Sequence, residues 1–171
     1  MHEYVTRHHP DWTWCCPALP VSPKAAMALV QALCRDWPKE RTAVVGSSLG
    51  GFYATYLGRK WAARTVLINP AVHPQTHGGQ LIGEFPLWHD PTQTMRFEPH
   101  FLDELAAMDT PQLPPWPDCM TLIGTQDEVL DPLELGRYYA NTQLHWVEGG
   151  DHALSGFRDW LPKVDAFLAR A

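Results

Sequence analysis

Short apolar runs alternate with longer segments of helical periodicity along most of the chain. The runs are rich in β-branched or aromatic residues and are bounded by Pro, Gly or Asn, which is typical of strands. They lie at residues 12–16, 42–45, 65–68, 120–124 and 143–147. This alternation predicts an α/β fold, with a mostly parallel sheet flanked by helices.

Helical patterns fall between these runs. In residues 24–36 the apolar positions repeat along one face, after a Ser22-Pro23 helix start signal. Similar patterns cover residues 49–61, 131–140 and 157–169. Because no repeat or low-complexity linker interrupts the chain, residues 1–171 are predicted to form a single domain.

Residues 71–117 break the alternation. This stretch is rich in Pro, Gly and aromatic residues, and within it only residues 100–109 have a helical pattern. A long irregular insertion in a compact domain is usually functional or mobile. We expect a cap-like insertion that shapes a substrate pocket, the alternative being a surface loop without a role.

Composition narrows the class of protein. The chain has 171 residues, of which 45% are hydrophobic and 19% charged, as in a folded globular protein with a sizeable core. Its formal net charge is −6 without a Lys/Arg cluster, which argues against a nucleic-acid partner because phosphate binding needs a basic surface. No apolar run is long enough to cross a bilayer, and the first residues lack the apolar core of a secretory signal. We therefore expect a cytoplasmic protein without a membrane span.

Neither cysteine nor histidine spacing indicates a metal site. Cysteines 15, 16, 34 and 119 contain no C-x-x-C pair, so we expect buried, reduced thiols. The nine histidines show no H-E-x-x-H motif and no paired Cys/His spacing. Neither a metal nor any other cofactor is expected.

The chemically most informative segment is AVVGSSLGG at residues 43–51. An apolar strand runs into a Gly-Ser-Ser-Leu-Gly turn followed by a helix, as in a nucleophile elbow that lifts a serine hydroxyl clear of the sheet. Such a tight turn favours small residues two positions before and two after the nucleophile. Ser48 has Gly46 and Gly50 at these offsets, whereas Ser47 has Val and Leu. Ser48 is therefore the predicted nucleophile.

A Gly-x-Ser-x-Gly string also occurs by chance, as a glycine-rich loop that closes a strand. The strand before it, the helix after it and suitable downstream partners favour the elbow. A helix that starts just after Ser48 points its first N–H groups at a developing oxyanion. We expect the backbone N–H of Leu49 to be the first such donor.

Asp127 is the predicted acid. It follows the predicted strand 120–124, at the carboxyl edge of the sheet where active sites of open α/β folds gather. Asp131 precedes Pro132 and is better explained as a helix N-cap. Glu128 is the alternative acid, and a loop carboxylate without a role is the structural alternative.

His152 is the predicted base. It follows the last predicted strand and a Gly149-Gly150 turn, which lets the backbone bring the imidazole over the sheet edge. His145 lies inside that strand and is interpreted as structural. The order Ser, acid, His is that of α/β-hydrolases.

Four segments together resemble a known family. They are VVGSSLGG (44–51), NPAVHP (69–74), GTQDEVLD (124–131) and EGGDHALSGF (148–157). In combination, and with HHPDW and PALP near the start, they are similar to the YqiA-like esterases of the α/β-hydrolase superfamily. The resemblance implies a small hydrolase of carboxylic esters or acyl thioesters, with its triad on Ser48, Asp127 and His152.

One element of that family does not occur in this chain. Its members open with a short apolar strand and an H-G-F-like loop, which supplies a second oxyanion N–H. This chain opens with MHEYVTRHHP, similar to the end of the helix that follows that loop. We therefore expect Met1 to be an internal start, with the native protein beginning roughly twenty or more residues upstream. The family strand would pair beside the nucleophile strand, whose ladder groups are otherwise exposed.

These inferences predict two-step acyl transfer on a small-molecule ester or thioester. Loss of one oxyanion donor typically costs ~10²–10³ in turnover, so activity is expected to be impaired in this form. The alternative is a non-catalytic, truncated homologue that acts as an interaction module.

Overall fold

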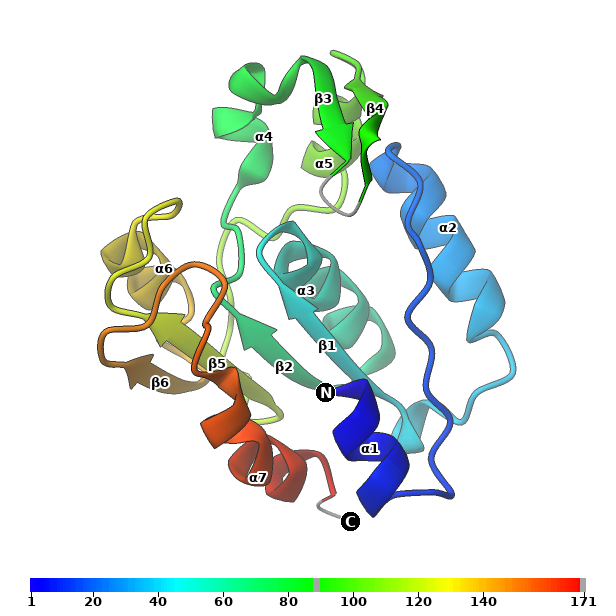
Figure 1. Cartoon of the computed structure of the whole chain (residues 1–171), viewed down its shortest axis with the longest axis vertical. Helices are drawn as coiled ribbons and strands as arrows, with labels where there is room; N and C mark the ends of the chain where they lie inside the picture. The colour runs from blue at the N-terminus through cyan, green and yellow to red at the C-terminus, as the bar shows by residue number, and fades with distance from the viewer. Residues whose placement is uncertain (88–89, 170–171) are drawn as a thin grey trace. The chain divides into compact units, whose positions relative to one another are not determined.

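A computed structural model describes residues 1–87 and 90–169 of the chain (Figure 1). The chain divides into two compact units. We call the first the sheet unit; it comprises Met1–Cys16, Pro38–Val72 and Gln112–Ala171. The second, the hairpin unit, comprises Pro17–Trp37 and His73–Pro111.

The sheet unit contains four parallel strands in the order β1-β2-β5-β6. They are β1 (Ala43–Ser47), β2 (Arg64–Ile68), β5 (Cys119–Gly124) and β6 (Gln143–Val147). Each coincides with a predicted strand to within two residues at either end. The predicted parallel sheet is therefore confirmed, and β1 lies at one edge of it.

Helices cover both faces of this sheet (Figure 1). Side chains alternate along the strands, so Leu67 faces one apolar cluster while Val66 and Ile68 face the other. The first cluster includes residues of α3 (Leu49–Trp61) and α6 (Pro132–Tyr138), and the second includes residues of α7 (Phe157–Leu168). Met1, at the start of α1 (His2–His8), packs against the second cluster. The result is a sheet between two helical layers.

The predicted strand at residues 12–16 is wrong. Residues 9–22 contain neither helix nor strand, and residues 10–16 are exposed. β-propensity expresses how well a side chain packs on a pleated, half-buried surface, so it forms no strand without neighbours to pair with. The short 3₁₀ helix η1 (Lys39–Arg41) then leads into β1.

The hairpin unit contains three helical segments besides its hairpin. They are α2 (Pro23–Leu33), α4 (Pro74–His77) and α5 (Phe101–Ala106), with the 3₁₀ turn η2 (Gly78–Leu81). The predicted start of α2 is confirmed, because the Ser22 hydroxyl accepts the Ala25 N–H at 3.1 Å. That hydroxyl also donates to Glu104 of α5 at 2.7 Å, which joins two distant segments of the chain.

The antiparallel hairpin of this unit was not predicted. Strands β3 (Gly83–Leu87) and β4 (Asp90–Phe97) pair within the stretch expected to be irregular. Each contains a proline, which argues against a strand in sequence analysis. The role of residues 71–117 as a cap stays a prediction. The described part of the chain contains no helix with the length and hydrophobicity of a membrane span.

The four cysteines are free thiols, but only two of them are buried. Cys34 and Cys119 lie in the interior as predicted, whereas the prediction for Cys15 and Cys16 is wrong. Cys15 and Cys16 lie in the segment predicted to be a strand. Because this segment forms no strand, it has no face that packs against the core, and its side chains are exposed.

We expect Ellman's reagent at pH 8 to modify Cys15 and Cys16 rapidly and Cys119 only after unfolding in urea. Burial raises the pKa of the Cys119 thiol to about 12, against a smaller opposing effect of its hydrogen bond with Thr121. Because only the thiolate reacts, both access and ionisation protect Cys119. Peptide mass mapping of the time course would identify each thiol. Modification of Cys119 in the folded protein at the rate of the exposed pair would contradict this.

Candidate active site

Ser48 occupies a strained turn between β1 and α3. Its backbone has φ 54° and ψ −126°, a conformation that L-residues with a Cβ rarely adopt. Hydrogen bonds hold it there: its N–H donates to the Ile68 carbonyl at 3.0 Å, and its carbonyl accepts from Gly51 at 2.8 Å and Ala71 at 3.0 Å. A strained serine in a strand-to-helix turn is the geometry expected for a nucleophile elbow.

The glycines of the turn differ in how much space surrounds them. A Cβ on Gly46 would lie 2.1 Å from the Gly50 carbonyl oxygen and 2.8 Å from the Ala54 Cβ, so this position excludes any side chain. A Cβ on Gly50 would meet nothing within 4 Å, so the described part of the turn has room for alanine at this position. The second restricted position is Gly51, where a Cβ would lie 2.6 Å from the Pro70 Cβ.

The three residues predicted as a triad lie together at the carboxyl ends of the parallel strands. His152 Nε2 lies 3.0 Å from Ser48 Oγ. His152 Nδ1 lies 2.9 Å and 3.0 Å from the two carboxylate oxygens of Asp127. Ser48 follows β1, Asp127 follows β5 and His152 follows β6, so three strand ends of one sheet determine the arrangement.

Asp127 is enclosed and well supplied with donors. Its side chain has 0% exposure, and its Oδ1 accepts the N–H groups of Val129 at 2.8 Å and Leu130 at 2.9 Å. These charge-assisted hydrogen bonds stabilise the carboxylate and fix its orientation toward the imidazole. With Nδ1–H donated to Asp127, the free lone pair of Nε2 faces the Ser48 hydroxyl. The arrangement can therefore take a proton from that hydroxyl.

The other carboxylates of this loop have different contacts. Glu128, the alternative acid, is exposed and accepts the backbone N–H of His152 at 3.0 Å. Asp131 caps α6, accepting the Leu133 N–H at 2.9 Å, which confirms its predicted role.

Leu49, the predicted oxyanion donor, is the first residue of α3, where helix N–H groups have no acceptor within the helix.

His145 lies within β6, as predicted. Its ring is tilted against Trp160, with centroids 5.5 Å apart, and Lys163 Nζ lies 3.5 Å from its Nδ1. Burial, and secondarily the charge of Lys163, lower the pKa of His145 below its ordinary value. These contacts fit the structural interpretation of this histidine.

Two polar groupings were not recognised from the sequence. Asn69, noted only as part of the NPAVHP segment, is buried beside the His152 loop. The feature of the sequence that could have identified Asn69 is its position directly after a buried strand, at the sheet edge where functional side chains gather. In the hairpin unit, His73 Nδ1 lies 2.7 Å from Asp109, which also accepts from Gln75 at 2.7 Å. That cluster joins the two ends of the segment His73–Pro111.

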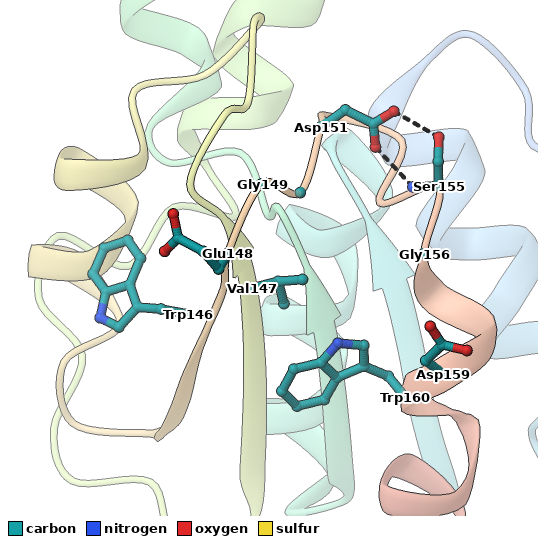
Figure 2. Close-up of a pocket in the computed structure, with 10 residues that line it drawn as sticks. Trp146, Val147, Glu148, Gly149, Asp151, Ser155, Gly156, Asp159 and Trp160 are labelled. Carbon is teal, nitrogen blue, oxygen red and sulfur yellow. Dashed lines mark hydrogen bonds between the residues drawn. The ribbon is translucent and has the colours of Figure 1, made fainter.

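A hollow of about 440 Å³ lies between the end of β6 and the start of α7 (Figure 2). Its lining residues include Trp146, Glu148, Asp159 and Trp160, but not Ser48, Asp127 or His152. Within residues 1–87 and 90–169, no three His, Cys, Asp or Glu side chains are grouped so that they could hold a metal ion.

Comparison with known proteins identifies the family. The model of a family described as "Uncharacterised protein family (UPF0227)" matches residues 1–169. The chain belongs to the UPF0227 family. A UPF0227 protein of Shewanella oneidensis is 29% identical over 129 residues, which are 72% of this chain and 63% of that relative. The chain thus spans less than two thirds of the length of that relative.

Solved structures similar to this UPF0227 chain identify its fold. The mouse α/β hydrolase domain-containing protein 10 matches with a TM-score of 0.52 and 16% identity, covering 84% of this chain and 70% of its own. A monoacylglycerol lipase of Paleococcus ferrophilus matches with a TM-score of 0.58 and 15% identity, covering 88% and 76%. The predicted α/β-hydrolase fold and the resemblance to the YqiA-like family are confirmed.

Proposed function

We propose that this UPF0227 chain is a serine hydrolase that cleaves carboxylic esters through an acyl-enzyme. The observation that carries the proposal is the 3.0 Å contact between Ser48 Oγ and His152 Nε2, on an imidazole whose other nitrogen contacts the enclosed Asp127. A serine hydroxyl, a base and an orienting carboxylate in this relation are the machinery of acyl transfer.

In the first half-reaction Ser48 Oγ attacks the ester carbonyl as its proton passes to His152 Nε2. The resulting tetrahedral oxyanion accepts a hydrogen bond from the Leu49 N–H at the start of α3. When the C–O bond to the alcohol breaks, His152 gives its proton to the leaving oxygen, and the acyl group stays on Ser48. Asp127 stabilises the imidazolium throughout.

In the second half-reaction water replaces the alcohol. His152 takes a proton from the attacking water and returns it to Ser48 Oγ, so the carboxylic acid leaves and the enzyme is restored. This sequence requires no metal or redox cofactor. Thioesters undergo the same chemistry with a thiol as leaving group, and we include them in the proposed substrate class.

The substrate class also has support from the comparisons. The similar Paleococcus ferrophilus protein is a monoacylglycerol lipase by name, and the resemblance to YqiA-like esterases indicates the same bond type. The chain has a formal net charge of −6, which disfavours strongly anionic substrates at long range. We therefore propose small, uncharged carboxylic esters as the first substrates to test.

We expect a fluorophosphonate probe to label the folded protein on Ser48. Phosphonylation requires an activated serine, so an ordinary surface hydroxyl does not react. Fragmentation of the labelled peptide separates Ser48 from its neighbour Ser47, and Ser47→Ala should keep the label while Ser48→Ala loses it. Folded, unlabelled wild-type protein would refute the proposal and favour a non-catalytic interaction module.

A further inference from the structure

The backbone carbonyl of His152 accepts a hydrogen bond from a buried side-chain amide. Asn69, directly after β2, has 0% exposure. Its Nδ2 donates to the carbonyls of Asp151 at 2.9 Å and His152 at 2.8 Å. Its Oδ1 accepts the Gly124 N–H, at the end of β5, at 2.8 Å. One side chain thus joins the ends of two strands to the loop that carries His152.

The chemistry of this position selects asparagine. Two carbonyl oxygens need donors and one N–H needs an acceptor, and a primary amide supplies both from one planar group. An aspartate would present oxygen to the two carbonyls, and leucine would leave all three groups unpaired. The backbone of Asn69 has φ 40°, in the left-handed region that Asn tolerates better than most residues with a Cβ.

A second side chain binds the backbone N–H of His152. Glu128 Oε2 accepts the His152 N–H at 3.0 Å. Glu128 follows Asp127, which contacts the imidazole of the same histidine. Side chain, N–H and carbonyl of His152 therefore each have a partner from outside its own loop.

The rest of the loop is fixed independently of these two residues. Leu154 is 1% exposed and belongs to the apolar cluster that includes residues of α7. Asp151 accepts the N–H and hydroxyl of Ser155 at 2.7 Å and 2.6 Å (Figure 2). A Cβ on Gly124 would lie 2.4 Å from the Gly150 carbonyl oxygen, so the strand end and the loop touch backbone to backbone. Removing Asn69 or Glu128 should therefore shift His152 without unfolding the loop.

We propose that Asn69 and Glu128 are positioning residues for His152, holding its carbonyl and its N–H so that Nε2 stays within reach of Ser48. This inference rests on the proposed hydrolase function and assigns a role to the Asn-Pro segment. The imidazole moves with its backbone, and a displacement of about 1 Å in a reacting group can cost about 10²-fold in rate.

Asn69→Gly removes the amide and retains access to positive φ. We expect its maximal rate of fluorophosphonate labelling to fall about tenfold to a hundredfold, while the half-saturating probe concentration stays the same. The low-field proton resonance of His152 Nδ1–H, bound to Asp127, should disappear. The matched control is Asn141→Gly in the same unit, where the Asn141 amide donates to the Leu113 carbonyl at 3.0 Å. The labelling rate of this variant should differ from that of the wild type by less than about twofold.

Glu128→Ala tests the same proposal at an exposed side chain, whose removal leaves no buried cavity. Its labelling rate should fall about threefold to tenfold, the effect of one lost hydrogen bond, and Glu128→Gln should restore it because the amide oxygen still accepts. This arm remains decisive if Asn69→Gly does not fold. Unchanged rates and an unchanged resonance in Glu128→Ala, or in folded Asn69→Gly, would overturn the proposal.

The two proposals fail in different ways. Unlabelled wild-type protein refutes the hydrolase function. The positioning proposal is refuted separately, when labelled wild-type protein and these variants behave alike. The proton resonance needs no substrate, so it reports the placement of His152 in either case.

Discussion

Asp127→Asn is expected to lower the rate of ester hydrolysis about 10⁴-fold while leaving the fold intact. The asparagine Oδ1 can still accept from Val129 and Leu130, which now bind the aspartate Oδ1 at 2.8 Å and 2.9 Å. Its NH₂ group then faces His152 Nδ1 and favours the tautomer with the proton on Nε2. That nitrogen can no longer accept the Ser48 proton, so the nucleophile is not activated.

The measurement is hydrolysis of p-nitrophenyl acetate, with the fluorophosphonate labelling rate as a second readout. Asp131→Asn is the matched control, four residues away in the same loop. Its helix-capping bond to Leu133 is retained because Asn is as good an N-cap as Asp. An Asp127→Asn enzyme within tenfold of wild type would mean that Asp127 does not orient His152.

Gly46→Ala is expected to destabilise the protein by about 3 kcal/mol and to abolish labelling of Ser48. The new Cβ would lie 2.1 Å from the Gly50 carbonyl oxygen and 2.5 Å from its carbonyl carbon. Because these are backbone atoms of the first turn of α3, no side-chain rotation relieves the clash. Relief requires α3 to move away from β1, which displaces Ser48 from His152.

Urea unfolding followed by circular dichroism would measure the change in the free energy of unfolding. Gly50→Ala is the control, since a Cβ there meets nothing within 4 Å. It should be stabilised by about 0.5–1 kcal/mol, as expected for Gly to Ala in a helix. Equal destabilisation of the two variants would show that the close approach at Gly46 does not limit this turn.

The sequence predicted the parallel sheet and the members of the candidate site for one physical reason. Buried parallel strands are short apolar runs, and their carboxyl ends meet at one edge, so residues that follow them converge. Ser48, Asp127 and His152 each follow such a run, and their distances of 2.9–3.0 Å agree with that inference. Their catalytic role remains a proposal.

Features that depend on which residues lie next to one another in the folded chain could not be predicted. Residues 12–16 have strand-forming side chains but pair with none of the described strands, whereas the hairpin β3–β4 forms despite its prolines. Gly50 satisfied a motif, but only the positions of neighbouring atoms reveal that Gly51 is the crowded one. The role of Asn69 similarly requires knowing which carbonyls face it.

The hairpin unit is built from two segments that are distant in the sequence, and this affects how the chain folds during synthesis. Pro17–Trp37 leaves the ribosome long before His73–Pro111, yet the two segments make one unit. Until α5 emerges, α2 lacks the Glu104 carboxylate that binds Ser22 and the Lys24 N–H. Isolated helices of about this length are only marginally stable in water, so we expect α2 to become stable only when α5 is present. We therefore expect the nascent chain to expose this segment to chaperones and proteases from its synthesis until α5 has emerged, an interval in which β1 and β2 are made.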